Sequence, residues 1–360
     1  MEKVKVRLNK RINRTYGILI DKNLFGKIPE ILKKKKLGNK YLIITDNNVE
    51  KLFGKKLLAA MKKQKLDVNL ISFKAGEQSK NLRVLEELLT KTQKLGLDRK
   101  SVIVALGGGV VGDVAGFVAA TYMRGINYVQ IPTSLLAMVD SSIGGKVAVD
   151  LLTGKNMVGA FHQPKSVFID VSLLKNLPKK ELLCGLSEVI KHALIMDKKL
   201  FDFIDDNIDK ILAKELDILI KLIRRNCEIK AKIVEKDENE EGLRKLVNYG
   251  HTVGHAIETL THYKKFSHGE AIAIGMAVAG RISNKLDRLS VKELEMQNDM
   301  LKRVGLSIKM PDLDKNVLIE ELRKDKKASD GKIEFVLLDS IGKARYGILV
   351  PNKIIVESLR

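Results

Sequence analysis

The stretch LGGGVVGDVAGFVAA, residues 106–120, decides the fold class. It directly follows an apolar run, residues 102–106, that is typical of a buried strand, and it continues as a helical pattern. Three of its glycines fit the pattern G-x-G-x-x-G: Gly107, Gly109 and Gly112. Between a strand and a helix, such glycines let the backbone approach a pyrophosphate, and the helix N-terminus offers free N–H groups and a positive dipole. The stretch therefore predicts a dinucleotide-binding α/β unit.

The rest of the first half of the chain favours the same class. Apolar runs at residues 40–45, 68–73, 101–106 and 128–132 are expected to be buried strands, and residues 82–95 carry helical spacing between them. Alternation of strands and helices predicts a parallel sheet with helices on both faces.

From about Leu177 the pattern becomes mostly helical. Helical patterns cover residues 182–194, 208–234 and 269–286, and strand-like runs return only near residues 335–338 and 346–350. We therefore expect a Rossmann-like, parallel-sheet domain over residues 1–176 and a mainly α-helical domain over residues 177–360. Ligands of such sheets bind at the carboxyl ends of the strands, so the active site is expected in the cleft between the two domains.

Composition limits the class of protein and its surroundings. The 360 residues suit two domains, since one domain usually takes about 100–200 residues. Two cysteines without a CxxC pair indicate a reducing cytoplasm. Residues 1–17 contain no apolar signal-peptide segment, and the longest apolar windows fall far short of the ~20 residues that a membrane span needs. We expect a cytoplasmic protein that does not bind membranes.

The formal net charge of +21 raises the question of nucleic acid. The lysines are scattered along the chain and few aromatic residues interleave with them, so we expect a solvated surface that attracts an anionic metabolite and no nucleic acid as main partner. A non-catalytic nucleic-acid binder stays as a rival, and a steep salt dependence of DNA binding would support it.

Acidic and basic residues near the predicted strand ends have two interpretations each. Asp46 could accept hydrogen bonds from ribose hydroxyls, or TDNN could be an Asx-rich turn. It comes before the glycines instead of about 20 residues after them, unlike the standard dinucleotide fingerprint. Glu77 and Lys80 could hold ribose or phosphate, or form a surface pair. Asp113 is expected at the helix start, as a cap or directed toward a nicotinamide-side group or a cation.

Four of the six histidines fall within residues 251–268, which favours a metal site. His251 and His255 are spaced i,i+4 and can share a metal on one helical face, and His268 lies just before another helix. The carboxylate ligand could be Glu188, although an exposed pairing with Lys191 or His192 explains that residue at least as well. The segment 138–164, with spaced lysines among glycines, suits an anionic substrate near a cofactor.

In combination, these motifs resemble the 3-dehydroquinate synthase family. The resemblance covers nearly the whole chain and is densest over residues 102–281. It rests on GGGVVGD, MRG, PTSLLAMVDSSIGGKVAVDLLTGKNMVGAFHQP, GLSEVIKHA, DENEEGLRKLVNYGHTVGHAIE and HGEA. It implies a homodimeric enzyme of the shikimate pathway that uses NAD and a divalent metal, zinc or cobalt.

The resemblance implies a role for each matching residue. Glu188, His251 and His268 match the metal ligands, and His255 matches a substrate-side histidine instead of a ligand. Matches to the substrate pocket and catalytic residues are Asp140, Lys146, Lys191, Lys230, Glu240, Arg244 and Asn248, with Arg124 delivered across a dimer interface and Lys327, or equally Lys326, on the phosphate side. Matches to NAD contacts are Asp46, Glu77, Gln78, Lys80, Gly108, Gly109, Val110, Val111, Gly112, Asp113, Thr133, Ser134, Lys146, Leu173, Leu174, Lys175 and Asn176, and Lys155 matches a position near cofactor and substrate.

The implied reaction converts 3-deoxy-D-arabino-heptulosonate 7-phosphate into 3-dehydroquinate and phosphate. It proceeds by transient oxidation at C5, phosphate elimination, re-reduction and intramolecular aldol closure, so net redox is zero. Two rival enzymes share parts of the pattern: a cyclase acting on another sugar phosphate, and a metal-dependent polyol dehydrogenase, which would release NADH.

Overall fold

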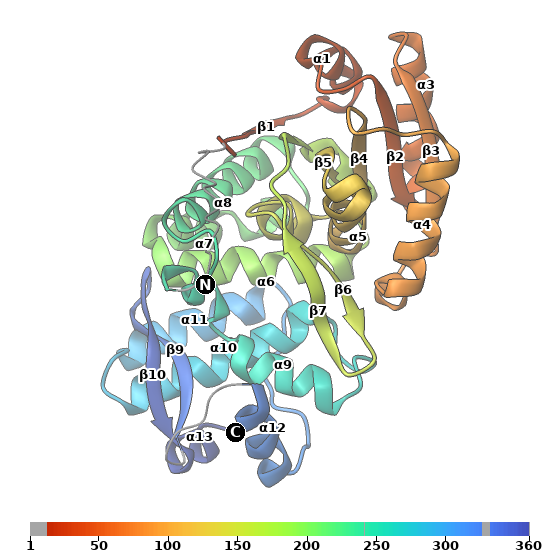
Figure 1. Cartoon of the computed structure of the whole chain (residues 1–360). Coiled ribbons are helices and arrows are strands. Elements are labelled where there is room, and N and C mark those ends of the chain that lie inside the picture. The colour runs from red at the N-terminus through yellow and green to blue at the C-terminus, as the bar shows by residue number, and fades with distance from the viewer. Residues whose placement is uncertain (1–12, 241, 326–331, 360) are drawn as a thin grey trace, which may run out of the picture.

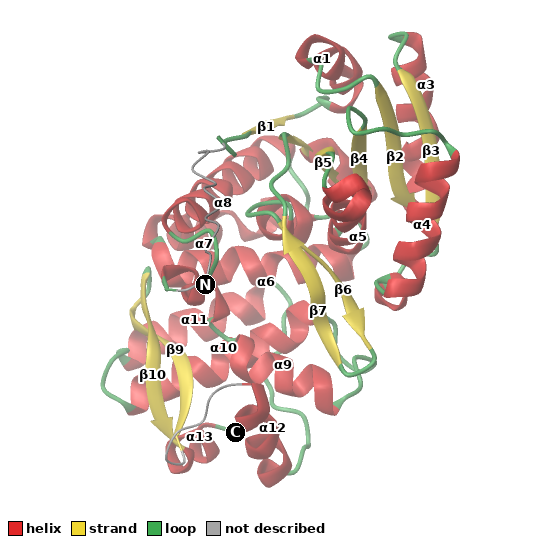
Figure 2. Ribbon diagram, in the orientation of Figure 1, coloured by secondary structure: helices red, strands yellow, loops and turns green. Residues whose placement is uncertain are grey.

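The computed structural model describes residues 13–240, 242–325 and 332–359. Figures 1 and 2 show a sheet flanked by helices, and a larger helical part beside it. The strands are β1 (Gly17–Asp21), β2 (Lys40–Asp46), β3 (Asp67–Phe73), β4 (Val102–Gly107), β5 (Asn127–Pro132), β6 (Lys146–Leu151), β7 (Gly154–Phe161), β8 (Ser166–Asp170), β9 (Lys332–Ser340) and β10 (Lys343–Pro351).

The α-helices are α1 (Ile28–Lys35), α2 (Asn47–Val49), α3 (Lys55–Lys63), α4 (Leu82–Lys94), α5 (Gly109–Thr121), α6 (Lys179–Met196), α7 (Lys198–Leu212), α8 (Leu216–Lys236), α9 (His251–Leu260), α10 (His268–Lys285), α11 (Val291–Arg303), α12 (Lys315–Asp325) and α13 (Asn352–Ser358). Three short 3₁₀ turns matter for the site: η4 (Tyr122–Arg124), η6 (Val171–Asn176) and η7 (Leu243–Asn248). Within the described residues, no helix is long and apolar enough to cross a membrane.

Six strands form one parallel sheet in the order β1-β8-β5-β4-β2-β3. All four strands predicted from the apolar runs are confirmed, and the Rossmann-like α/β class is confirmed with them. The chain leaves β2 toward β3 and leaves β4 toward β5, so the direction of winding reverses between β2 and β4. Such a reversal opens a crevice at the carboxyl ends of the two strands, where ligands of these folds bind.

Alternate residues of the strands face two apolar layers. Tyr41 and Ile43 pack with α1 and α3, and Leu42 and Ile44 pack with α4 and α5. The first layer continues without a break into the helical part, where it includes Ile274 of α10. One core therefore joins the sheet to the helices, while the division of domains after residue 176 stays a prediction.

The structure departs from the expected elements in two places. Segment 138–164 contains the antiparallel hairpin β6–β7, and strands β1 and β8 complete the sheet. The helical pattern over residues 208–234 belongs to two helices, because Lys214 adopts a left-handed conformation (φ 58°) between α7 and α8. The Lys214 ammonium donates to the carbonyl of Leu177 at 2.6 Å, which anchors this turn.

Candidate functional site

The glycine loop lies where the sequence predicts it, between β4 and α5 at the reversal of the sheet. Helix α5 begins at Gly109, and no side chain caps its N-terminus. Beside it, the N–H of Thr133, at the end of β5, donates to the carbonyl of Gly107 at 2.9 Å. A Cβ on Gly108 would meet the Ser134 hydroxyl at 3.4 Å. The first turn of α5 therefore presents its backbone N–H groups at the crevice, as an anion site requires.

Asp113 does not cap α5, because it lies one turn inside the helix. It forms an ion pair with Lys80, at 2.5 Å, and Lys80 also bonds the side-chain oxygen of Asn156. Burial raises the pKa of Asp113 to about 6, although the Lys80 ammonium opposes this rise. The interpretation of Lys80 as half of a surface pair with Glu77 is wrong, since Lys80 is only 5% exposed.

Other predicted nucleotide contacts occupy the same edge of the sheet. The Asp46 carboxylate accepts from the N–H groups of Asn48 and Val49, so the Asx-turn geometry is present. Gln78 is exposed after β3, and Val110 and Val111 lie in the first turn of α5. The turn η6 follows β8, with the side chains of Leu173 and Leu174 in the core and Lys175 and Asn176 exposed.

Glu188, His251 and His268 come together from three helices. The Nε2 atoms of both histidines lie 3.7 Å from the same oxygen, Oε1 of Glu188. This oxygen is buried and has no hydrogen-bond partner among the described residues, while Oε2 accepts from the Lys191 ammonium. The interpretation of Glu188 as an exposed pairing is wrong, because Glu188 and Lys191 are both 1% exposed.

Close helix packing places these three side chains. A Cβ on Gly250, just before α9, would lie 2.8 Å from the Met276 backbone nitrogen, and Gly250 has a positive φ of 80°. A Cβ on Gly269 would clash with the backbone of Cys184 in α6. Glycines at both points bring α9 and α6 against α10, so the starts of α9 and α10 face the middle of α6.

The electrostatic environment of the cluster suits metal ligation. Burial and the neighbouring Lys191 hold the pKa of His251 well below its usual value, so this imidazole is neutral. Burial alone would raise the pKa of Glu188, but Lys191 and His251 reverse that effect and keep it ionised. Burial alone would lower the pKa of His268. The carboxylates of Glu188 and Glu258 have the larger effect and raise that pKa to about 9. A divalent cation would displace that proton, since ligands bind metals deprotonated.

His255 stands apart from this group. Its ring centroid lies 5.1 Å from that of His251. Among the described residues, however, His255 is close enough to share an ion with Glu258 and His268, and not with Glu188 and His251. His251 and His255, although spaced i,i+4, do not fall in the same group of potential metal ligands.

Basic side chains gather next to the cluster. The Lys230 ammonium lies 2.5 Å from Asp140, and Lys146 pairs with Glu240. Arg244 is buried, and its guanidinium donates to the carbonyls of Glu238 and Gly144 at 2.6 and 3.3 Å. Asn248 is half-buried at the end of η7.

These cations are not fully neutralised. Burial is the main cause that lowers the pKa of Lys146 to about 8, and the positive charges of Arg244, Lys230 and Lys191 lower it further. The Arg244 Nε finds no hydrogen-bond partner among the described residues. A group of four cations beside a metal-type cluster is arranged to receive an anion.

Lys155 connects the two halves of the site from hairpin β6–β7. Its ammonium lies 3.2 Å from Glu77, 4.0 Å from Glu258 and 4.2 Å from the centre of the Tyr263 ring. The hairpin runs past α5 toward α9 (Figure 1). Lys155 therefore lies between the nucleotide edge and the histidine cluster.

One described residue of the expected site, Arg124, is not brought together with the others. Arg124 is exposed in η4, beyond the carboxyl end of α5, while the glycine loop is at the amino end. At 1.5 Å per residue, the 13-residue helix separates them by roughly 20 Å. Lys327, and the alternative Lys326, lie outside the described residues.

Sequence reasoning missed the buried polar residues Glu258 and Asn226, and it considered His192 only as an exposed partner of Glu188. Glu258 contacts His268, and Asn226 lies 2.6 Å from Nδ1 of His192, whose Nε2 is 3.5 Å from Asp140. Glu258 is three residues after His255 and His192 is four residues after Glu188, so helical spacing could have predicted both.

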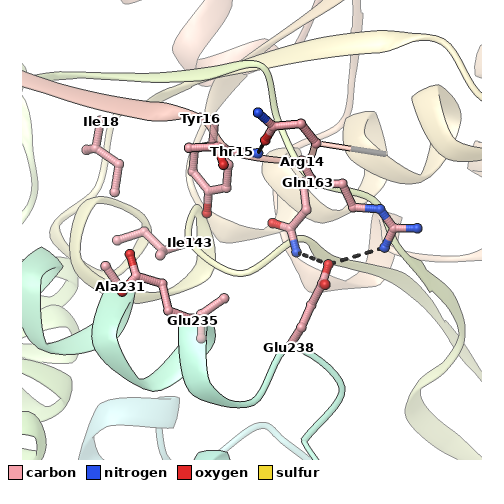
Figure 3. Close-up of a pocket in the computed structure, with 11 residues that line it drawn as sticks. Arg14, Thr15, Tyr16, Ile18, Ile143, Gln163, Ala231, Glu235 and Glu238 are labelled. Atoms are coloured by element: carbon pink, nitrogen blue, oxygen red, sulfur yellow. Dashed lines mark hydrogen bonds and ion pairs between the residues drawn. The ribbon is translucent and has the colours of Figure 1, made fainter. Parts of the chain in front are cut away.

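A cavity of about 570 Å³ lies away from this cluster, among β1, α8 and the end of the hairpin (Figure 3). Glu238 at its edge contacts Arg14 at 3.4 Å and Gln163 at 2.9 Å. It contains none of the predicted site residues. The hydroxyl of Tyr16, which lines the cavity, accepts a hydrogen bond from the N–H of Gly144. This hydrogen bond supports the turn before Lys146.

Comparisons with known proteins agree with the fold. A 2-epi-5-epi-valiolone synthase from Streptomyces hygroscopicus subsp. jinggangensis, solved with NAD⁺ and Zn²⁺ bound, superposes with a TM-score of 0.90 at 26% identity, covering 99% of this chain and 98% of that one. A 2-deoxy-scyllo-inosose synthase with carbaglucose-6-phosphate, NAD⁺ and Co²⁺ gives 0.86 at 28% identity, covering 95% and 96%. The chain thus has the fold of the sugar phosphate cyclases.

Sequence comparison narrows this class. Models of the 3-dehydroquinate synthase N-terminal and C-terminal regions match residues 70–184 and 185–328. A 3-dehydroquinate synthase of Thermoanaerobacter pseudethanolicus is 50% identical over 331 residues, covering 92% of this chain and 93% of the relative. The chain belongs to the 3-dehydroquinate synthase family.

Proposed function

We propose that this protein converts 3-deoxy-D-arabino-heptulosonate 7-phosphate into 3-dehydroquinate and phosphate, as a lyase that depends on NAD and on zinc or cobalt. The observation that carries the proposal is the cluster of Lys146, Lys191, Lys230 and Arg244 beside Glu188, His251 and His268. A substrate with both a carboxylate and a phosphate needs that many cations, and vicinal hydroxyls suit a metal with open positions.

The donor set fits a divalent metal. Two imidazoles and one carboxylate, with all three ligand atoms within 4.8 Å of one another, leave a coordination position open, which is typical of a catalytic site. The unpartnered Oε1 of Glu188 is the atom that such an ion would satisfy. When bound, the metal supplies Lewis acidity that lowers the pKa of a substrate hydroxyl.

The glycine loop fits a dinucleotide. The uncapped start of α5 would bind the pyrophosphate, and Asp46, at the end of β2, would face the ribose. Lys80 and Asp113 would lie on the nicotinamide side, held together by their ion pair. NAD supplies a reversible hydride acceptor, so it would return unchanged at the end of the reaction.

The remaining residues would bind and orient the substrate. Lys146 and Arg244 would hold its anionic groups, with Lys230 kept in place by Asp140. Asn248 and Glu240 would bind hydroxyls at the rim, and Lys327 would contact phosphate. His255, next to His251, is in reach of a proton relay to the substrate.

We also propose a homodimer in which Arg124 enters the site of the second copy. The outer face of hairpin β6–β7 exposes Leu152, Met157 and Phe161, and Met123 next to Arg124 is 43% exposed. Exposed apolar side chains along an unpaired edge strand favour association. A mixture of the inactive variants R124A and K146A should regain activity if Arg124 acts across the interface, whereas no gain would oppose it.

We place the protein in the cytoplasm, since Cys184 and Cys227 are both buried and free.

Substrate competition tests the reaction. The purified protein, with NAD and zinc, should release phosphate from 3-deoxy-D-arabino-heptulosonate 7-phosphate at a far higher kcat/KM than from other sugar phosphates. Removal of the metal by a chelator should stop release, and added Zn²⁺ or Co²⁺ should restore it. Preference for another sugar phosphate would assign the chain to a different cyclase, such as those that the two solved structures represent.

A further inference from the structure

Glu258 is a buried carboxylate directly behind the histidine cluster. It is 4% exposed, on the third turn of α9, and has no part in the function proposed above. Its Oε2 lies 3.4 Å from Nδ1 of His268, and Nε2 of the same ring lies 3.7 Å from Glu188. The two nitrogens of His268 therefore face two different carboxylates.

We propose that Glu258 is a positioning residue that fixes the tautomer and the ring orientation of His268. A carboxylate can only accept, so the proton of the neutral imidazole is held at Nδ1 and the lone pair is left on Nε2. Nε2 is the atom that faces Glu188 Oε1, as does Nε2 of His251. Metal-binding histidines are commonly oriented by an outer carboxylate in this way. The inference rests on the metal site of the proposed function.

A competing arrangement makes Glu258 a ligand itself. Glu258, His255 and Nδ1 of His268 could also share an ion. In that group, however, Glu258 contacts a nitrogen at hydrogen-bonding distance, and its second oxygen faces the Lys155 ammonium at 4.0 Å. Oε1 of Glu188, by contrast, is buried without any partner among the described residues. Glu188 therefore has an unsatisfied oxygen, Oε1, that a metal ion could bind, whereas both oxygens of Glu258 already contact other side chains.

Lys155 makes Glu258 a link between the two parts of the site. The ammonium contacts both Glu77, at the nucleotide edge, and Glu258. Through Lys155, the position of hairpin β6–β7 is coupled to the carboxylate that orients His268.

The test compares Zn²⁺ affinity, measured by chelator competition, in the full-length protein and in E258Q, E258L, H268A, H255A and the control E228Q, whose half-buried residue pairs with Arg224 outside the cluster. Loss of an outer-shell carboxylate typically costs about 10- to 100-fold in metal affinity. We expect E258L to lose that much, E258Q to lose less because its amide oxygen still accepts, and H268A to lose the most. H255A and E228Q should bind zinc as the unchanged protein does.

Co²⁺ absorption supplies a second readout. At saturating cobalt, E258Q should keep the visible spectrum of the unchanged protein, because the ligands are the same. Unchanged zinc affinity in E258Q and E258L, with loss in H268A, would overturn the positioning role. Losses of equal size in E258Q and H255A, with an altered cobalt spectrum, would make Glu258 a ligand. Unchanged affinity in H268A would reject the metal site itself, and hence the proposed function. Should E258L not fold, the result for E258Q decides between these outcomes.

Discussion

The nucleotide edge and the histidine cluster are built in opposite ways. The glycine loop is one continuous stretch, and its backbone at the start of α5 is the surface proposed to bind the nucleotide. The cluster takes single side chains from three helices, α6, α9 and α10, and Glu188 of α6 lies far from the two histidines along the chain. A site made from backbone is therefore visible as a local motif, whereas a site made from side chains depends on how the helices pack.

The largest expected effect is that of removing the His268 side chain, which should affect the histidine cluster and leave the nucleotide edge unchanged. H268A removes a ligand, so zinc affinity and kcat should both fall by more than the roughly 100-fold that outer-shell losses reach. NAD affinity should stay unchanged, because the glycine loop does not contact this side chain. Metal analysis, turnover and NAD titration measure the three quantities. A parallel loss of NAD binding would show that the two regions are one coupled unit.

The second effect concerns the buried cations. K230M leaves Asp140 without its 2.5 Å partner, and breaking a buried ion pair costs about 3 kcal/mol or more of unfolding free energy. The double variant D140N/K230M removes both charges and should recover most of that stability without recovering activity. Denaturant unfolding and kcat/KM distinguish the two quantities. If the double variant is no more stable than K230M, the pair is not the source of the cost.

A smaller effect, on stability, is expected from a substitution in the glycine-rich stretch of residues 106–120. Gly116 of α5 packs against Val147 of hairpin β6–β7, where a Cβ would clash with Val147 Cγ1. G116A should cost about 1–3 kcal/mol of stability by overpacking. In V147A/G116A the clashing methyl is absent, so stability should return. G108A is the matched control, since its Cβ would meet the nearest atom, a hydroxyl, at 3.4 Å. Equal losses in G116A and G108A would contradict this packing role.

The smallest effect is a pH dependence at Asp113. Burial raises its pKa in the folded protein to about 6, against an ordinary value of 3.8. Between pH 4 and pH 6 the folded state thus binds more protons than the unfolded state, and stability falls as pH rises. Relative to D113N, the unchanged protein should lose thermal stability across that window. Parallel stability curves for the two proteins would place the pKa of Asp113 near its ordinary value.

The same contrast explains what the sequence alone could predict. Strands β2 to β5 are long apolar runs, and all four were predicted from them. Strands β1 and β8 are only five residues each, too short to show a clear hydrophobic pattern. Hairpin β6–β7 lies in glycine-rich sequence, which also obscures the alternation of apolar and polar residues. The antiparallel pairing in that hairpin depends on α5, against which it packs.

At the cluster, local spacing pointed to a pair of histidines that the structure does not place in one group of potential ligands. His251 and His255 share a helix face, yet Nε2 of His251 faces Glu188 and His268, from other helices. Spacing alone left Glu188 either as a metal ligand or in an exposed pairing with Lys191 or His192, but all three residues are buried. The resemblance implied the group Glu188, His251 and His268, whose potential ligand atoms do lie together in the structure.

The most direct test of the account compares phosphate release with NADH absorbance in one reaction. With 3-deoxy-D-arabino-heptulosonate 7-phosphate, NAD and zinc, we predict one phosphate per substrate and no accumulation of NADH. That result would show that the nucleotide edge and the metal cluster act on one substrate in a closed redox cycle. NADH accumulating in step with substrate loss, without phosphate, would contradict it and indicate a dehydrogenase.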